Sequence, residues 1–209
     1  MLAPSQIRQL TGDLEEPAKS IALLLVLTGL RVGELLALRW QNIDLANRTL
    51  RVSATVYDGH FDTPKTQRSN RTVPLCSRAA LVLAGRRSEC NNAGDLVFST
   101  RQGQPLSRHN LLRRQLRPVC NKLGFYGITW HSLRHSHATL LDAVGAPLGT
   151  VQALLGHSTS EITREVYLHA IPDDQRRAVA GVESLVFESN RTQTDSTLAV
   201  AENGVVVSN

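Results

Sequence analysis

Residues 21–40 read IALLLVLTGLRVGELLALRW, and this stretch sets most of the expected fold. The apolar run at 21–27 is too short to cross a bilayer, so it predicts a helix buried in a protein core. Gly29 is expected to end that helix, because glycine is favoured just past a helix C-terminus. A second helix would then carry Arg31 near its beginning and Glu34 one turn later. Glu34 is either a partner that orients Arg31 or an ordinary exposed carboxylate.

The flanking segments continue this pattern on both sides. Pro4 begins a predicted helix, and TLRVSATV at 49–56 alternates as a strand, with a further extended piece after it and RTVPL at 71–75. Lys65 lies in a polar segment that predicts a hairpin tip. Helical patterns return at 77–88, 107–122, 131–144, 147–155 and 159–168. We therefore expect an α+β fold, mainly helical, with a small antiparallel sheet.

Composition suits one compact domain with a basic surface. The chain has 209 residues and is 42% hydrophobic, enough to bury one good-sized core. Its net charge is +5, but residues 181–209 carry −3, which leaves +8 on residues 1–180. A basic body suits a polyanionic partner such as nucleic acid, because neutralised phosphates release condensed counterions. Charge alone fits a merely soluble basic surface about equally well.

The cysteines bear on the cellular compartment. Cys76, Cys90 and Cys120 are odd in number and lack CxxC spacing, which argues against a disulfide framework or a structural zinc site. A reducing cytoplasm fits this usage. The N-terminus shows no succession of basic, apolar and small residues that would indicate a secretory signal.

Three segments far apart in the sequence point to DNA breakage and rejoining. They are RVGELLALRW at 31–40, HSLRHSH at 131–137, and GHSTSEITREVYLHA at 156–170, which contains Tyr167. A tyrosine hydroxyl has a pKa of about 10, so it attacks a phosphate poorly unless cations surround that phosphate. The chain supplies such cations at Arg31, Lys65 and Arg134, together with nearby histidines.

These residues resemble those of the tyrosine recombinases, the phage integrase family. RVGELLALRWQNIDL is similar to the first arginine box of that family, and TPKTQRSNRTVPL to its lysine hairpin. HSLRH is similar to its His-x-x-Arg box, and LLGH, followed ten residues later by Tyr167, to its closing segment. The resemblance covers roughly residues 1 to 180, and the order of the four pieces makes it specific.

The resemblance implies a role for each of six residues. Tyr167 would be the nucleophile, forming a 3′-phosphotyrosyl bond and releasing a 5′ hydroxyl. Arg31 and Arg134 would clamp the nonbridging oxygens, which the planar fork of a guanidinium suits. Lys65 would protonate the 5′ oxygen, His131 would accept the tyrosine proton, and His157 would donate a further hydrogen bond to the phosphate. No metal or other cofactor is then required.

The sequence fits zinc, serine-nucleophile and two-metal chemistries less well. His131 and His135 are four residues apart, like the zinc ligands of HExxH proteins, but Ser132 stands where that motif has glutamate. The sequence contains no GxSxG elbow for a serine nucleophile. Asp44, Asp58 and Asp62 lack the spacing of a two-metal nuclease. A type IB topoisomerase-like enzyme that relaxes DNA, or a truncated DNA-binding protein that does not cut, remain alternatives.

The domain organisation is expected to be simple. Residues 1–185 would form the catalytic domain, and residues 186–209 a polar tail that is disordered or docks on a neighbouring protomer. The N-terminal core-binding domain that integrases of this family generally carry is absent from this chain. Expected partners are double-stranded DNA, further copies of the chain assembled on DNA, and accessory DNA-bending proteins, with no membrane involved.

Overall fold

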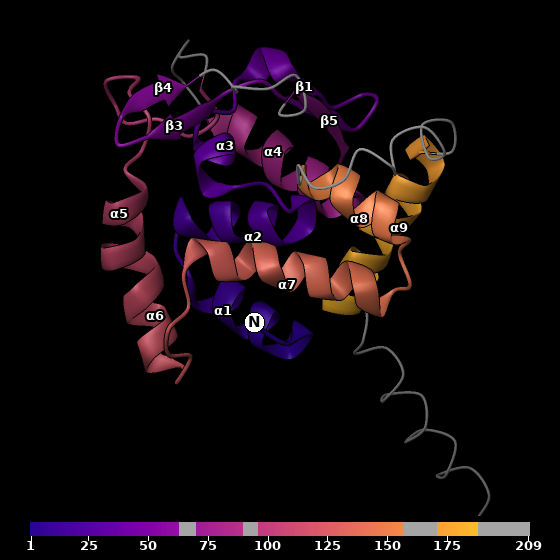
Figure 1. The fold of residues 1–209 in the computed structure, drawn as a ribbon. Helices are drawn as coiled ribbons and strands as arrows, with labels where there is room; N and C mark the ends of the chain where they lie inside the picture. Colours follow the sequence, from indigo (N-terminus) through magenta and orange to yellow (C-terminus); the bar gives the residue numbers. More distant parts are fainter. Residues whose placement is uncertain (63–69, 90–95, 157–170, 188–209) are drawn as a thin grey trace, which may run out of the picture.

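The chain is mainly helical, with small antiparallel sheets at one end of the helical body (Figure 1). A computed structural model describes residues 1–62, 70–89, 96–156 and 171–187. The helices are α1 (Pro4–Asp13), α2 (Ala18–Thr28), α3 (Val32–Leu36), α4 (Ser77–Glu89), α5 (Arg108–Leu111), α6 (Arg117–Lys122), α7 (Trp130–Ala143), α8 (Leu148–Leu155) and α9 (Ile171–Phe187). None of these described helices is both long and apolar enough to cross a membrane. The predicted fold class is confirmed.

Helix α2 is the centre of the core, as the apolar run predicts. Every residue of α2 except Lys19 is buried, and the helix contacts α1, α3, α4, α7 and α9. Burying a leucine side chain of this kind stabilises a fold by about 1.5–3 kcal/mol, so this helix holds the other elements together. Gly29 ends α2 in the left-handed conformation, with φ of 65°, as expected.

The strands form two separate sheets rather than one. β1 (Ile43–Asp44), β2 (Thr49–Val52) and β5 (Arg71–Pro74) pair in the order β1-β2-β5, and β3 (Thr55–Tyr57) pairs with β4 (His60–Asp62). The single strand predicted at 49–56 is therefore divided. The physical reason is that β3 turns away from β5 to pack on α3, where Gly33 leaves room for the backbone of Val56.

The helix predicted at 107–122 is interrupted at its middle. Between α5 and α6 lies the π-helical turn η3 (Leu112–Leu116), in which the Arg117 N–H donates to the Leu112 carbonyl. Pro118 has no N–H for the Arg114 carbonyl and its ring crowds the preceding turn, so the regular hydrogen-bond ladder cannot continue there. The short 3-10 turn η1 (Trp40–Asn42) precedes β1.

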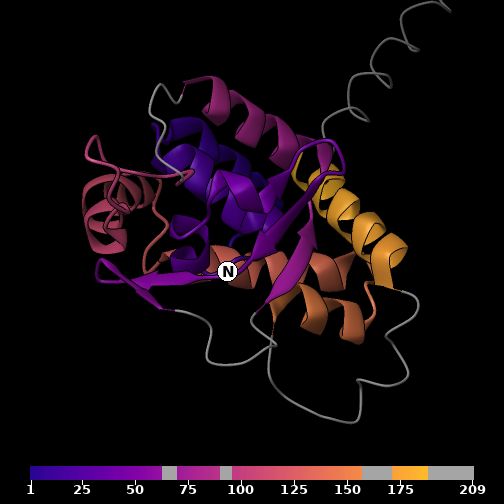
Figure 2. The same ribbon diagram turned by 90° about the horizontal axis from the view of Figure 1, so that it is seen from above.

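The helices predicted from the sequence do not include α9. It packs against α1, α2, α7 and α8, and it lies at the opposite side of the molecule from α5 and α6 (Figure 2). Val179, Val182 and Val186 are buried on its inner face, and this spacing was a helical signal. The helix runs through Phe187, so the domain boundary expected after residue 185 falls within it.

Three sequence predictions cannot be compared with this structure. The hairpin tip with Lys65, the helix at 159–168 and the tail beyond Phe187 lie outside the described residues.

Candidate active site

Arg31 stands at the N-terminus of α3 with its guanidinium half exposed. Its backbone is extended, and Glu34 accepts hydrogen bonds from both its backbone N–H and its Nη1, at 2.8 and 2.9 Å. The Arg31 side chain nevertheless retains 46% exposure. Glu34 is therefore the orienting partner of Arg31, and part of the guanidinium remains available to an anion at the surface.

Glu34 is buried and shared between two arginines. Arg71 donates from Nη1 to Glu34 Oε1 at 3.0 Å and from Nη2 to Oε2 at 2.8 Å, the parallel fork geometry that is strongest for this pair. Burial opposes ionisation of Glu34, but the hydrogen bonds and charge of Arg71, with the bonds from Arg31, outweigh it and lower its pKa. The carboxylate is therefore charged at neutral pH, contrary to the alternative of an ordinary exposed group.

Arg71 also reaches the end of α8. Its Nε donates to the Leu154 carbonyl at 3.0 Å, and its side chain packs against Gly156, the left-handed residue that ends α8. With both Nη atoms engaged by Glu34, the side chain is only 8% exposed. Sequence reasoning missed this residue, because an arginine beginning a short strand carries no signal of what its side chain will contact.

Arg134 joins the C-terminal ends of two helices. From α7, its Nη1 donates to the Gly29 carbonyl at the end of α2. Its Nη2 donates to the Leu155 carbonyl at the end of α8, at a distance of 2.5 Å. Burial, and then the nearby charge of Arg31, lower its pKa to about 10, so it stays protonated at neutral pH. Carbonyls at helix C-termini carry partial negative charge, which favours a guanidinium at this position.

His131 lies one turn before Arg134 on α7 and is exposed. Desolvation lowers its pKa, and the charges of His135, Arg134 and Arg31 lower it further. An imidazole whose pKa is below its ordinary value is neutral at pH 7 and can accept a proton. The His131 and His135 rings meet edge to face, with centroids 4.4 Å apart. No three His, Cys, Asp or Glu side chains among the described residues are grouped to hold a metal.

His137 lies one turn after Arg134 on the same side of α7 and contacts the last turn of α2. It is fully buried, and its Nδ1–H donates to the Val26 carbonyl at 2.7 Å. Burial lowers its pKa to about 4, so the ring is neutral. The ring leaves no space above Gly29: a Cβ built there would lie 2.4 Å from His137 Cδ2.

Replacing Gly29 by alanine is therefore expected to destabilise the fold. A left-handed alanine costs about 1–2 kcal/mol, and overpacking adds about 1–3 kcal/mol, which together give a loss of about 2–5 kcal/mol in unfolding free energy. Urea denaturation measures this loss in unfolding free energy. Gly124→Ala is the matched control, because Gly124 also has positive φ but nothing within 4 Å of a Cβ. Equal losses in the two variants would show that the contact with His137 costs nothing.

Three of the six predicted site residues are described, and the structure brings them together. Arg31, His131 and Arg134 come from α3 and α7, and their charges act on one another. Lys65, His157 and Tyr167 lie outside the described residues. The segment with His157 follows directly on Gly156, and the segment with Lys65 ends just before Asn70, so both adjoin residues close to Arg71.

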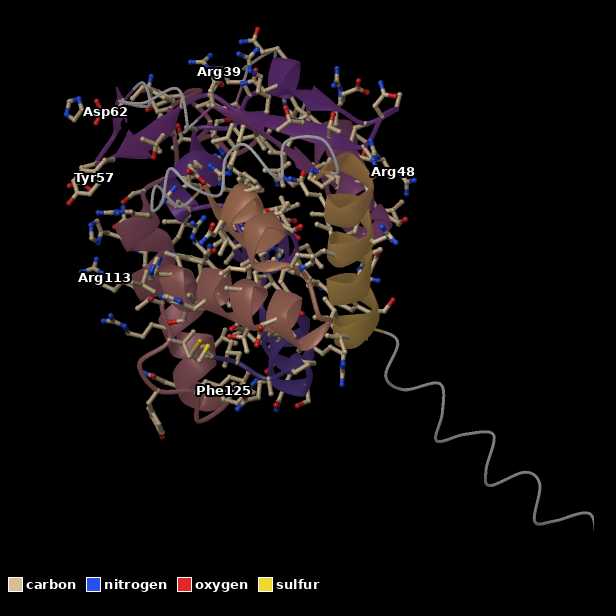
Figure 3. The ribbon with its side chains drawn as sticks, turned by 45° about the vertical axis from the view of Figure 1, so that its right-hand side comes forward. Arg39, Arg48, Tyr57, Asp62, Arg113 and Phe125 are labelled. Atoms are coloured by element: carbon tan, nitrogen blue, oxygen red, sulfur yellow. The ribbon has the colours of Figure 1, made fainter. Side chains whose placement is uncertain are left out.

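A second group of basic and aromatic side chains lies near β3 and α5. The Arg108 guanidinium stacks over the Tyr57 ring at 4.1 Å, and Arg39 stacks over Phe61 at 5.4 Å. Tyr57 is 56% exposed, and its side chain and that of Arg113 point away from the helical body (Figure 3). Exposed arginine and aromatic groups of this kind suit contacts with nucleic acid phosphates and sugars.

Comparison with known proteins points to one family. A sequence model described as the Phage integrase family matches residues 1–173. The chain is 35% identical to a "Tyrosine recombinase XerC-like" protein of Caldanaerobacter subterraneus subsp. tengcongensis, covering 80% of this chain and 49% of that protein. It is 32% identical to the integrase of Staphylococcus phage L54a, covering 77% of this chain and 50% of that protein. The chain thus spans about half the length of these curated relatives.

Solved structures share the fold at lower identity. The Tn1549 transposon integrase, in complex with a circular intermediate DNA, matches with a TM-score of 0.67 and 22% identity, covering 84% of this chain and 63% of that one. The XerA recombinase matches with a TM-score of 0.63 and 23% identity, covering 84% and 61% of the respective chains. At these identities the likeness concerns the fold alone.

Proposed function

Because the chain belongs to the phage integrase family, we propose that it acts in site-specific DNA recombination or integration, cleaving and rejoining double-stranded DNA through Tyr167. One observation supports this function most directly. Arg134 bonds the Gly29 carbonyl, two residues before Arg31, and His131 lies one turn before Arg134 on α7. These residues are far apart in the sequence, yet they form one cluster of two guanidinium charges and a neutral imidazole. Such a cluster suits a phosphodiester that is attacked by a weak nucleophile.

The proposed reaction begins with attack of the Tyr167 hydroxyl oxygen on the scissile phosphorus. A phosphotyrosyl bond to the DNA 3′ end forms, and the bond between phosphorus and the 5′ oxygen breaks. His131 accepts the tyrosine proton, and Lys65 gives a proton to the leaving 5′ oxygen. Rejoining reverses these steps with a 5′ hydroxyl as the nucleophile, so the energy of the phosphodiester is conserved.

The arginines would stabilise the charge that develops on the nonbridging oxygens. Arg31 faces the surface with a guanidinium already oriented by Glu34, so little rearrangement is needed to bind an oxygen. Arg134 would add positive charge near the same oxygens from its position at the ends of α2 and α8. His157 would donate to the same phosphate. No metal ion is needed in this scheme, because protonated side chains supply the positive charge.

Double-stranded DNA is the proposed partner, in the cytoplasm. Several copies of the chain are proposed to assemble on DNA, together with accessory DNA-bending proteins, and the segment after residue 187 is proposed to dock on a neighbouring protomer. Residues up to about 185 are proposed as the catalytic domain. Because its basic side chains would neutralise DNA phosphates, DNA binding by this domain should be strongly salt-dependent.

The proposed function predicts a covalent protein–DNA adduct that forms equally well in excess EDTA. The substrate is a nicked duplex carrying a candidate attachment sequence from DNA beside the gene, assayed at low salt and resolved on a denaturing gel. A magnesium-dependent nuclease in the same buffer serves as the control for chelation. Cleavage that stops in EDTA and returns with Mg²⁺ or Zn²⁺ would instead assign the chain to the metal-dependent nucleases.

A further inference from the structure

We infer that Arg71 is a positioning residue that fixes three described parts of the protein relative to one another: Arg31, the last turn of α8, and the start of β5. Because this role presupposes the DNA cleavage proposed above, the tests below separate failure of one from failure of the other. Arg71 itself touches no reacting atom in this scheme. Its side chain is 8% exposed, and each of its three guanidinium nitrogens donates a hydrogen bond within the protein.

The first connection runs through Glu34 to Arg31. Arg71 holds both carboxylate oxygens of Glu34, and the same two oxygens accept from the Arg31 backbone N–H and Nη1. The carboxylate therefore cannot rotate without breaking bonds to both arginines. Since Glu34 is buried, no water competes for its oxygens, and the direction of the half-exposed Arg31 guanidinium follows that of the Glu34–Arg71 pair.

The second connection runs to the end of α8. Arg71 Nε donates to the Leu154 carbonyl, and the Arg71 guanidinium packs against Gly156, the residue just before His157. Arg134 holds the adjacent Leu155 carbonyl. Two guanidinium groups thus fix successive carbonyls in the last turn of α8.

The third connection is covalent. Arg71 begins β5 and pairs with Val52 of β2, immediately after the segment that carries Lys65. Its neighbour Asn70 accepts a hydrogen bond from Arg51 Nε at 3.3 Å. The start of β5 is therefore anchored at the same residue whose side chain orients Arg31.

Arg71→Lys is the variant that tests this role. A lysine keeps the positive charge beside Glu34, but one ammonium cannot supply the parallel fork and the bond to Leu154 together. We expect DNA affinity to change little and the rate of adduct formation on saturating nicked DNA to fall by up to about 100-fold, as misplaced catalytic groups cause. Arg101→Lys is the matched control, because Arg101 is an exposed arginine outside these three connections and should cleave at the wild-type rate.

A purely structural role predicts a different result. In that case Arg71→Lys would lower the melting temperature but cleave at the wild-type rate well below it, and the positioning role would be overturned. If Arg71→Lys fails to fold, the double variant Arg71→Gln/Glu34→Gln replaces the ion pair by two neutral amides and leaves no unpaired buried carboxylate. Wild-type cleavage by that folded variant would overturn the role equally.

A measurement on the free protein is independent of DNA cleavage. The Gly156 N–H donates to the Gln152 carbonyl at 2.9 Å at the end of α8. We expect hydrogen exchange of this amide to become faster in Arg71→Lys and to stay unchanged in Arg101→Lys. Unchanged exchange in Arg71→Lys would overturn the connection to α8. If the wild-type chain forms no adduct on any substrate, the proposed function fails, while this exchange experiment still decides whether Arg71 fixes α8.

Discussion

Replacing Tyr167 by phenylalanine is expected to abolish covalent attachment to DNA while noncovalent binding stays nearly intact. The change removes one hydroxyl oxygen and no charge, so the phosphate contacts of the arginines remain. Adduct formation on a nicked duplex and a gel-shift titration at low salt measure the two properties separately. Tyr57→Phe and Tyr126→Phe are the controls, because these side chains are 56% and 78% exposed and should be dispensable for cleavage.

A Tyr167→Phe protein that still formed a denaturation-resistant adduct would contradict this assignment. Another nucleophile, such as Tyr57 or Tyr126, would then carry the reaction. Loss of the adduct in either control variant, with Tyr167 intact and DNA affinity unchanged, would have the same meaning.

Replacing Arg31 or Arg134 by alanine is expected to reduce the cleavage rate by roughly 100-fold or more in each case, since each is proposed to stabilise the charge that develops on the phosphate. Their effects on stability should differ. Arg134→Ala leaves the Gly29 and Leu155 carbonyls without this partner, which costs about 1–3 kcal/mol for each buried group left unsatisfied. Arg31→Ala should cost little stability, because its side chain is half exposed and Arg71 still pairs with Glu34.

Single-turnover cleavage at saturating DNA, DNA affinity and urea denaturation distinguish these effects. The arginines act on the transition state if the rate falls far more than the affinity does. Equal losses in rate and affinity would reduce Arg31 and Arg134 to simple DNA contacts. Equal losses of stability in the two variants would contradict the structural role assigned to Arg134.

Features with local periodicity were predictable from the sequence. The apolar run at 21–27 predicted a buried helix that ends at Gly29. Arg31 was therefore placed correctly at the start of α3. The pairing of Arg31 with Glu34 follows from their spacing on one turn. The fold class and the family likewise followed from patterns and motifs contained within single segments.

Features that depend on contacts between distant segments were not predictable in this way. The division of the strand at 49–56 depends on the packing of β3 over Gly33 of α3. The bonds of Arg71 join β5 to α3 and α8, and no local pattern marks an arginine for that role. Helix α9 is different, because the helical spacing of its buried valines is visible in the sequence and would have predicted it.

Tyr167 is proposed to become covalently linked to the 3′ end of cleaved DNA. The most direct measurement is mass spectrometry of the protein after reaction with a nicked duplex, proteolysis and nuclease digestion. We predict that a residual nucleotide is attached through phosphate to the peptide that contains Tyr167, and that the released DNA strand carries a 5′ hydroxyl. A nucleotide attached to any other residue, or a cleaved strand with a 5′ phosphate and no peptide adduct, would contradict the account.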